Sequence, residues 1–208
     1  MVIISDDCIP CKGILILGNG PSLNTQRDLM PEVGKHHTFC CTRMYLWDGL
    51  CFTPTYYACN LELVHMGIEP QDPPFEKLKF AISFDGEISY GWYSYTKSPD
   101  EPISTDSEIL RSGGTMPFIA TQIAVRLGYK NIYYLGVEQT GRGHCFDPEG
   151  KVHPFIPHRP FKMTDRWSEM KELYEKNGIT LRDCTPNGKL NEILGYKSLE
   201  EVLRDYNC

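Results

Sequence analysis

The chain has 208 residues, of which 41% are hydrophobic and 23% are charged, and its formal net charge at pH 7 is −6. These values are typical of an ordinary globular protein, and we expect one domain over residues 1–208. The acidic balance argues against a nucleic-acid surface that depends on broad positive potential, and it favours a small molecule as the partner.

The sequence contains no apolar run long enough to cross a bilayer, and its first seven residues lack the basic start and apolar stretch of a secretion signal. We therefore expect a cytoplasmic protein without a membrane span, and a homo-oligomer is compatible with the sequence. Nine cysteines form no evenly spaced framework, so we expect reduced, largely buried thiols. Cys8 and Cys11 have the spacing of a zinc or redox pair, but no second pair follows, and an N-terminal turn is the simpler interpretation.

The first predicted strand is the apolar run at 13–17, which stops at a glycine turn. A continuous apolar run of this kind is typical of a strand buried on both faces. Ser22 is placed to cap a short helix after the turn. Residues 37–42 and 55–59 are predicted as the second and third strands.

Between residues 67 and 108 the pattern is interrupted by prolines, acidic residues and aromatics, and only 79–84 resembles a strand. We expect this stretch to be a loop-rich insertion or lid. Apolar positions at helical spacing after Thr115 then predict a helix that ends at Gly128. Residues 131–135 are predicted as a buried strand.

A second lid-like loop is predicted at 141–162, where three of the six histidines lie among glycines and prolines. Residues 164–177 follow as an amphipathic helix, and 179–184 as the last strand. Strands that alternate with helices predict an α/β fold with a mainly parallel sheet flanked by helices. In such folds ligands gather at the carboxyl ends of the strands.

The turn after the first strand is the strongest candidate for a binding site. Glycines allow the backbone to approach an anion, and the following helix start offers free N–H groups. The turn is neither the dinucleotide fingerprint, which has a third glycine, nor a Walker loop, which has Gly-Lys-Ser/Thr. Plain turn chemistry without a ligand is the alternative for its five residues: Gly18, Asn19, Gly20, Pro21 and Ser22.

A second turn that could bind an anion precedes the helix predicted after Thr115. Small residues and hydroxyls lie there near the positive end of a helix dipole. An ordinary helix N-cap is the alternative, but two such turns in one chain together favour a ligand that carries phosphates. The residues of this second turn are Ser112, Gly113, Gly114 and Thr115.

Three segments together resemble known proteins: ILILGNGPSL at 14–23, SGGT at 112–115 and LGYKNIYYLGV at 127–137. They are similar to the bacterial sialyltransferases of glycosyltransferase family 42. They are also similar to the related domain of archaeal 6-hydroxymethylpterin diphosphokinases, which is common in bacterial and phage proteins. Both resemblances imply a Rossmann-like fold, and they extend weakly through 145–147 and 184–187.

The sialyltransferase resemblance implies a transferase that takes a group from a nucleotide-activated donor and delivers it to an acceptor hydroxyl, with no cofactor required. It implies that both turns and Asn60 contact the donor. His158 falls near the family's catalytic base, His153 is its rival, and His144 is the next candidate. A neutral imidazole suits this role near pH 7. A loop histidine that is exposed or bonded to the backbone is the alternative.

Two departures from the family pattern bear on activity. Thr42 stands where the family has an asparagine, and His144 where it has a tyrosine that steadies the leaving phosphate. They leave open a nucleotide-binding protein without turnover. The diphosphokinase resemblance implies instead magnesium-dependent diphosphate transfer from ATP, with Mg²⁺ held by Glu138 and Asp147. Solvated loop charges are the alternative for both carboxylates.

Overall fold

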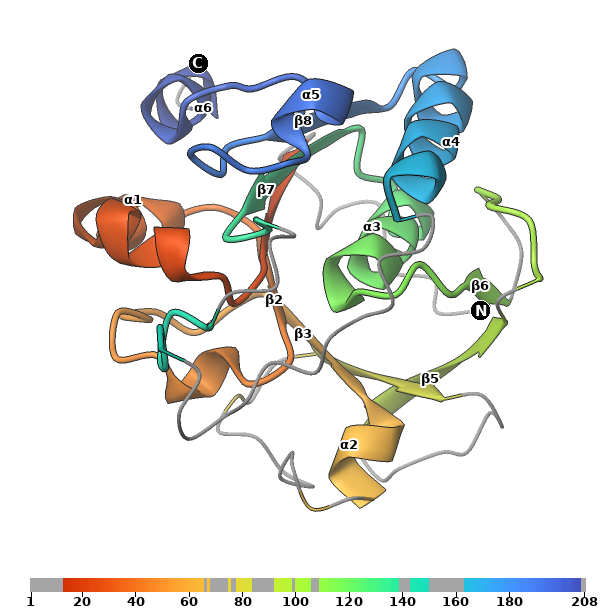
Figure 1. Ribbon diagram of the computed structural model, residues 1–208, viewed down its shortest axis with the longest axis horizontal. Coiled ribbons are helices and arrows are strands. Elements are labelled where there is room, and N and C mark those ends of the chain that lie inside the picture. Colours follow the sequence, from red (N-terminus) through yellow and green to blue (C-terminus); the bar gives the residue numbers. More distant parts are fainter. Residues whose placement is uncertain are drawn as a thin grey trace.

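The computed structural model describes residues 13–65, 67, 75, 78–83, 92–98, 100–105, 109–138, 143–149 and 163–206. In these residues eight strands form a sheet in the order β6-β5-β4-β3-β2-β1-β7-β8, and all neighbouring pairs are parallel. With helices on both faces (Figure 1), this confirms the predicted α/β fold with a parallel sheet flanked by helices. The strands are β1 (Gly13–Leu17), β2 (Thr38–Cys41), β3 (Tyr56–Asn60), β4 (Leu78–Ser83), β5 (Trp92–Ser98), β6 (Leu110–Arg111), β7 (Asn131–Leu135) and β8 (Thr180–Asp183).

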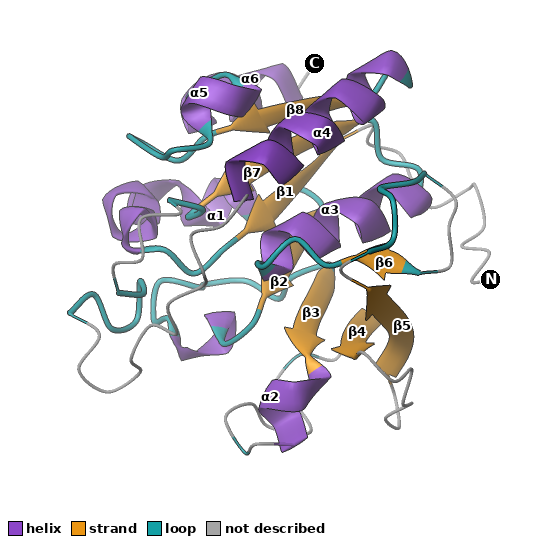
Figure 2. Cartoon of the chain, turned by 45° about the vertical axis from the view of Figure 1, so that its right-hand side comes forward, coloured by secondary structure: helices purple, strands orange, loops and turns teal. Residues whose placement is uncertain are grey.

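Helices cover the two faces of the sheet. On one face lie α3 (Met116–Arg126) and α4 (Met163–Lys176), and on the other lie the 3₁₀ helix η2 (Pro21–Leu29), α1 (Met30–Val33) and α6 (Leu199–Tyr206) (Figures 1 and 2). The longest helix, α4, has 14 residues, and no helix in the described part of the chain is long and apolar enough to cross a membrane. Shorter segments are η3 (Met44–Leu46), α2 (Leu61–His65) and α5 (Asn191–Leu194).

The position of β1 determines where a ligand can bind. All five of its residues are buried, and its last residue, Leu17, pairs with Cys40 of β2 on one side and Leu135 of β7 on the other. Strands β2 to β6 follow one another on one side of β1, and β7 and β8 lie on its other side. The strand order therefore reverses direction between β1 and β7, and α/β folds of this type bind ligands at the carboxyl edge beside such a reversal.

The core buries both faces of the sheet. On one face the ring of Trp167 in α4 lies edge-on against Phe118 of α3 and Tyr134 of β7, with ring centroids 5.2 Å apart in each pair. Because both faces are buried, the central strands are continuous apolar runs rather than alternating ones. On the other face leucines of β1 pack with residues of α1 and α6: Leu15, Leu17, Met30, Val33, Leu199, Val202 and Leu203.

Two expectations from the sequence need correction. Residues 67–108 are not only an insertion, because β4 and β5 lie in this stretch and extend the sheet. The sequence of β5, WYSYTKS, is rich in aromatic and β-branched residues that favour strands. Ser22 does not cap a helix: η2 begins at Pro21, whose fixed φ suits a first helical position, and Gly20 is the N-cap.

Candidate functional site

The glycine turn after β1 is held against the segment that follows β7. The N–H of Gly18 donates to the carbonyl of Leu135 (2.8 Å), and that of Gly20 donates to the carbonyl of Gly136 (2.9 Å). A Cβ on residue 18 would overlap with the carbonyl oxygen of Gly136. Glycine is therefore required here for the approach of two backbone segments, whether or not a ligand binds.

The carboxylate of Glu138 occupies the same turn. Its Oε1 accepts a hydrogen bond from the N–H of Ser22 (2.6 Å), and its Oε2 lies where a Cβ on Gly20 would be. Free N–H groups and the helix dipole stabilise an anion at the start of a helix. The Glu138 carboxylate thus binds an N–H that was expected to bind a ligand phosphate.

Asn19 links three loops at this edge. Its Nδ2 donates to the carbonyl of Thr42 after β2 (3.1 Å), and its own carbonyl accepts from the N–H of Cys145 (2.8 Å). Asn24 holds the Cys145 loop as well, because its Nδ2 donates to the Cys145 carbonyl (2.9 Å) while its Oδ1 accepts from Nε1 of Trp47 (2.9 Å). Asn19 is therefore part of the frame that positions these loops.

Arg43 lies just beyond β2 and is not among the site residues predicted from the sequence. Its backbone is left-handed (φ 62°), and its N–H donates to the hydroxyl of Tyr57 (3.0 Å). The residue is only 8% exposed; its Nη2 donates to Nε2 of His144 (3.3 Å), and its guanidinium lies over Phe146, 5.8 Å from the ring centroid. His144 stacks on Phe146, with centroids 5.0 Å apart and 13° between the planes. We call Arg43, His144 and Phe146 the Arg43 cluster.

Asn60 ends β3 at the same edge of the sheet. Its Oδ1 accepts a hydrogen bond from Nζ of Lys97 in β5 (2.6 Å), and Lys97 is only 7% exposed. A buried ammonium that binds the amide oxygen fixes the orientation of the Asn60 side chain. The amide nitrogen is then the donor that Asn60 can offer to a ligand.

The second predicted turn connects β6 to α3. The N–H of Ser112 donates to the carbonyl of Ser98 (2.8 Å), and the Ser112 carbonyl accepts from Nη1 of Arg166 in α4 (2.7 Å). The backbone of Ser112 is therefore committed to bonds that tie β5 and α4 to this turn.

The remaining residues of this turn form the start of α3. Gly113 lies beneath Phe118, whose ring would overlap with a Cβ at position 113, and Gly114 is left-handed (φ 82°). Thr115 is the N-cap residue, as the alternative interpretation expected, but its side chain makes no capping hydrogen bond. Contact with a nucleotide stays a prediction for this turn.

Several buried polar atoms at the carboxyl edge have no hydrogen-bond partner in the described structure. Each such atom costs about 1–3 kcal/mol, and such atoms also occur elsewhere, as at Trp167 Nε1; it is the position of four of them at one edge of the sheet that is consistent with a ligand or ordered water there. Three are hydroxyl oxygens and one is a guanidinium nitrogen. They lie in the segments that follow β1, β2 and β6: Ser22 Oγ, Thr42 Oγ1, Arg43 Nε and Thr115 Oγ1.

The end of β8 supports the loop after β7. The N–H of Val137 donates to Oγ1 of Thr185 (3.1 Å), and the N–H of Thr185 donates to Oδ1 of Asp183 (2.9 Å). Asp183 is fully buried, and its Oδ2 has no partner among the described residues. Burial raises the pKa of the Asp183 carboxyl to about 7, although hydrogen bonds from Thr185 act in the opposite direction. Asp183 therefore titrates near neutral pH.

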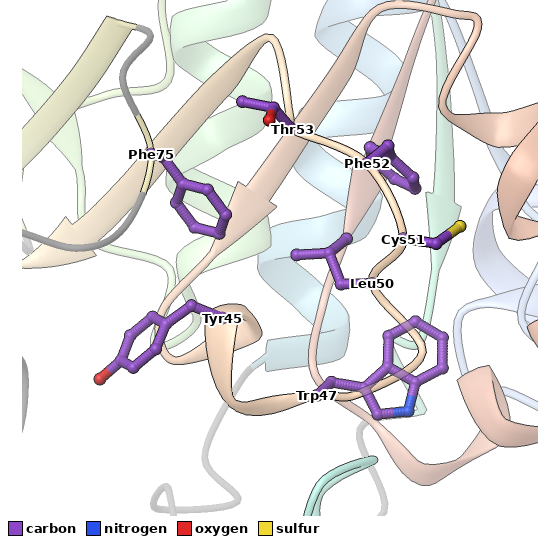
Figure 3. Close-up of a pocket in the computed structure, with 7 residues that line it drawn as sticks. All are labelled: Tyr45, Trp47, Leu50, Cys51, Phe52, Thr53 and Phe75. Carbon is purple, nitrogen blue, oxygen red and sulfur yellow. The ribbon is translucent and has the colours of Figure 1, made fainter.

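The segment that follows Arg43 forms most of an open hollow of about 450 Å³ (Figure 3). Tyr57 connects the two regions, because its hydroxyl accepts from the Arg43 N–H and its ring packs against Phe75 with centroids 5.0 Å apart. Aromatic walls suit a planar or apolar ligand face. No residue singled out from the sequence lines the hollow, whose walls are Tyr45, Trp47, Leu50, Cys51, Phe52, Thr53 and Phe75.

Of the three histidines predicted as bases, the structure describes only His144. His153 and His158 lie outside the described residues. Because a guanidinium can only donate, Nε2 of His144 must be the acceptor from Arg43. The lone pair at this nitrogen is occupied, so His144 is placed to hold Arg43 rather than to take a proton at Nε2.

The described cysteines agree with the expectation of reduced thiols. Six are described, all free, and Cys51 is the exposed one among them. Burial raises the pKa of the Cys145 thiol to about 12, which keeps it protonated. Cys8 and Cys11 lie outside the described residues.

The two carboxylates predicted as magnesium ligands have different surroundings. Glu138 accepts from the Ser22 N–H, whereas Asp147 exchanges backbone hydrogen bonds with His144 (2.9 and 3.0 Å). Among the side chains that the structure describes, no three His, Cys, Asp or Glu groups gather as metal ligands. Magnesium binding stays a prediction.

The fold is similar to that of solved bacterial sialyltransferases. The α-2,3-sialyltransferase Cst-I of Campylobacter jejuni is 16% identical with a TM-score of 0.56, over 94% of this chain and 82% of that one. CstII of the same organism with cytidine-5′-monophosphate is 16% identical, with a TM-score of 0.55 over 88% and 84%. CstII with CMP-3FNeuAc is 14% identical, with a TM-score of 0.52 over 88% and 85%. No family model and no curated protein matches the sequence.

Proposed function

We propose that this chain is a transferase that binds a nucleotide-activated sugar at the carboxyl edge of its sheet and delivers the sugar to an acceptor hydroxyl. The observation that carries the proposal is the group of unpartnered buried hydroxyls and the buried arginine nitrogen at this edge. A nucleotide sugar offers hydroxyls and a phosphate, which match these groups chemically. The shared fold supports the same class of ligand, since CstII was solved with CMP and with CMP-3FNeuAc.

The polar groups at this edge include one carboxylate and several uncharged side chains, and these suit the hydroxyls of a ligand rather than its phosphate. The Glu138 carboxylate is anionic, so it repels a phosphate, but it has lone pairs that accept hydrogen bonds from ribose or sugar hydroxyls. The amide nitrogen of Asn60 and the hydroxyls of Ser22 and Thr115 add uncharged partners. We assign these residues to the hydroxyl-rich parts of the donor.

The transfer itself requires a base. The acceptor oxygen attacks the anomeric carbon, the bond from that carbon to the phosphate oxygen breaks, and the nucleoside monophosphate leaves with the bonding electrons. The proton of the acceptor hydroxyl passes to the base, for which an imidazole is suited near neutral pH. We assign this role to His158, with His153 as the rival residue of the same loop.

The test is titration calorimetry of the purified protein with CMP, UMP, GMP and AMP, followed by a turnover assay with the sugar conjugate of the nucleotide that binds. We expect one nucleotide to bind and turnover to continue in EDTA. Failure of all four nucleotides to bind would contradict the proposal. Magnesium-dependent conversion of ATP to AMP, with no turnover of any sugar conjugate, would indicate diphosphate transfer instead. Binding without turnover would indicate a nucleotide-binding protein.

Replacing the proposed base separates binding from chemistry. His158→Ala should lower turnover by about 10²- to 10⁴-fold with little change in donor affinity. The wild-type rate should rise with pH along a limb with an apparent pKa of about 6 to 7. His153→Ala is the matched control; if it alone lowers turnover, the base is His153. If neither variant slows a measured transfer, the assignment of the base is wrong.

A further inference from the structure

We propose that Arg43 is an anion-binding residue of this protein and that its guanidinium binds an oxyanion of the substrate. The identity of that oxyanion as the donor phosphate rests on the proposed function. The existence of the anion site rests on the surroundings of Arg43 alone.

Arg43 is buried without a carboxylate partner among the described residues, unlike Arg27 and Arg111. Arg27 pairs with Asp48, and Arg111 pairs with Glu169 (2.9 Å). These pairs lie near the surface, whereas Arg43 is only 8% exposed and forms no ion pair with any described residue. A buried charge without a counter-charge is unfavourable, so an external anion is the partner that this site lacks.

The hydrogen-bonding capacity of Arg43 is mostly unused. A guanidinium has five N–H groups, and the described structure gives one side-chain bond, from Nη2 to His144. Nε is buried and has no acceptor, and the neighbouring Thr42 Oγ1 is buried and unpartnered as well. Nε and a terminal nitrogen present parallel donors that match two oxygens of a phosphate or carboxylate.

The side chain is nevertheless held in place. Its backbone adopts a left-handed conformation that is unfavourable for a residue with a Cβ. His144 accepts from Nη2, and Phe146 supports both the guanidinium and the imidazole ring. His144 and Phe146 are therefore positioning residues, and they restrain a cation whose Nε has no acceptor in the described structure.

The location favours a ligand at the crevice. Arg43 directly follows Thr42, whose carbonyl is bound by Asn19 of the glycine turn (3.1 Å). In that turn the Ser22 N–H is already bound to Glu138 (2.6 Å). Of these two neighbouring places, Arg43 is therefore the one that has no anionic partner among the described residues.

The experiment compares CMP with cytidine by titration calorimetry in wild-type protein and in Arg43→Met, which keeps an unbranched side chain without the charge. We expect wild-type protein to prefer CMP, and Arg43→Met to lose about 10- to 100-fold in CMP affinity with little change for cytidine. The matched control is Arg27→Met, which removes an exposed arginine on η2 and should leave both affinities unchanged.

Inorganic pyrophosphate and glucuronate, each alone, are the second set of probes. Wild-type protein should bind pyrophosphate more tightly than Arg43→Met does; a loss confined to glucuronate would identify a sugar carboxylate as the anion. Arg43→Lys keeps the positive charge and should therefore retain part of the affinity for the anion. It replaces Arg43→Met in these titrations if that variant does not fold.

The possible failures are distinguishable. If CMP binds equally to wild-type protein and both Arg43 variants, the anion site is overturned while nucleotide binding stands. If no nucleotide binds but pyrophosphate binds in an Arg43-dependent manner, the proposed function fails and the anion site stands. If wild-type protein binds none of these probes and none of CMP, UMP, GMP and AMP, both are overturned.

Discussion

The two turns that flank the centre of the sheet differ in charge: an internal carboxylate fills the first, whereas the second holds a guanidinium without a counter-charge among the described residues. Backbone groups are hydrogen-bonded in both turns, and Ser22 Oγ, Thr42 Oγ1 and Arg43 Nε are unpartnered. In the glycine turn after β1, the N–H groups of Gly18 and Gly20 bind backbone carbonyls of the β7 loop, and the N–H of Ser22 binds Glu138. In the turn after β2, Thr42 Oγ1 and Arg43 Nε are buried without partners.

This difference shows that the protein's own groups can fill a conspicuous glycine motif. Glycines are required wherever backbones approach closely, and in the glycine turn the approaching group is another part of the chain. A buried cation without a counter-charge is the stronger indication of a missing ligand.

Gly18→Ala should give the largest loss of stability, about 3 kcal/mol. Its Cβ would overlap with the carbonyl oxygen of Gly136, and two hydrogen-bonded backbones have little freedom to separate. Urea unfolding at pH 7 measures the effect. Stability equal to that of the wild type would mean that the glycine turn is not packed against the β7 loop as described.

The free energy of unfolding should depend on pH through Asp183, which holds the β7 loop through Thr185. The folded-state pKa of Asp183 is raised from 3.8 to about 7, so the folded protein binds this proton more tightly than the unfolded chain does. The stabilisation is therefore fully present below pH 3.8 and is lost as pH rises through 7, by about 2–3 kcal/mol between pH 5 and pH 8. Unfolding of Asp183→Asn should lack this decline, and an unchanged pH dependence would contradict the assignment.

Gly20→Ala should cost about 1–2 kcal/mol, less than Gly18→Ala, because its Cβ meets the end of the flexible Glu138 side chain rather than backbone. In a Glu138→Ala background the cost of Gly20→Ala should be smaller, since the carboxylate that blocks the position is gone. A double-mutant cycle by urea unfolding measures this coupling. Additive costs would argue against contact between Glu138 and the turn.

Arg43→Met should have the smallest effect on the ligand-free protein, within about 1 kcal/mol of the wild type or slightly stabilising. Removal of a buried, unpaired charge offsets the lost bond to His144. Thermal unfolding without ligand measures it. A loss of several kcal/mol would indicate that Arg43 is a structural residue and not a ligand-binding one.

The sequence predicted the central strands and the longer helices because their signals are local. Continuous apolar runs identified β1 and β7, and helical spacing identified α3 and α4. Strand β5 was missed because glycine and proline surround its aromatic residues, and α6 because its three buried residues, Leu199, Val202 and Leu203, are few.

The site was predictable only in part because its important contacts join residues far apart in sequence. The glycine turn could be recognised from its spacing, but its bond to Glu138 spans 116 positions. Arg43 meets His144 across 101 positions, and no local pattern indicates that its guanidinium is buried without a carboxylate. The position of an arginine directly after a buried strand was the one signal available in the sequence.

The most direct test of this contrast is a crystal structure of the protein with the nucleoside monophosphate that it binds most tightly. We expect the phosphate oxygens to accept hydrogen bonds from the Arg43 guanidinium, with Glu138 still bound to the N–H of Ser22. A phosphate bound to the N–H groups of the glycine turn, with Glu138 displaced and Arg43 without contact to the ligand, would contradict the account.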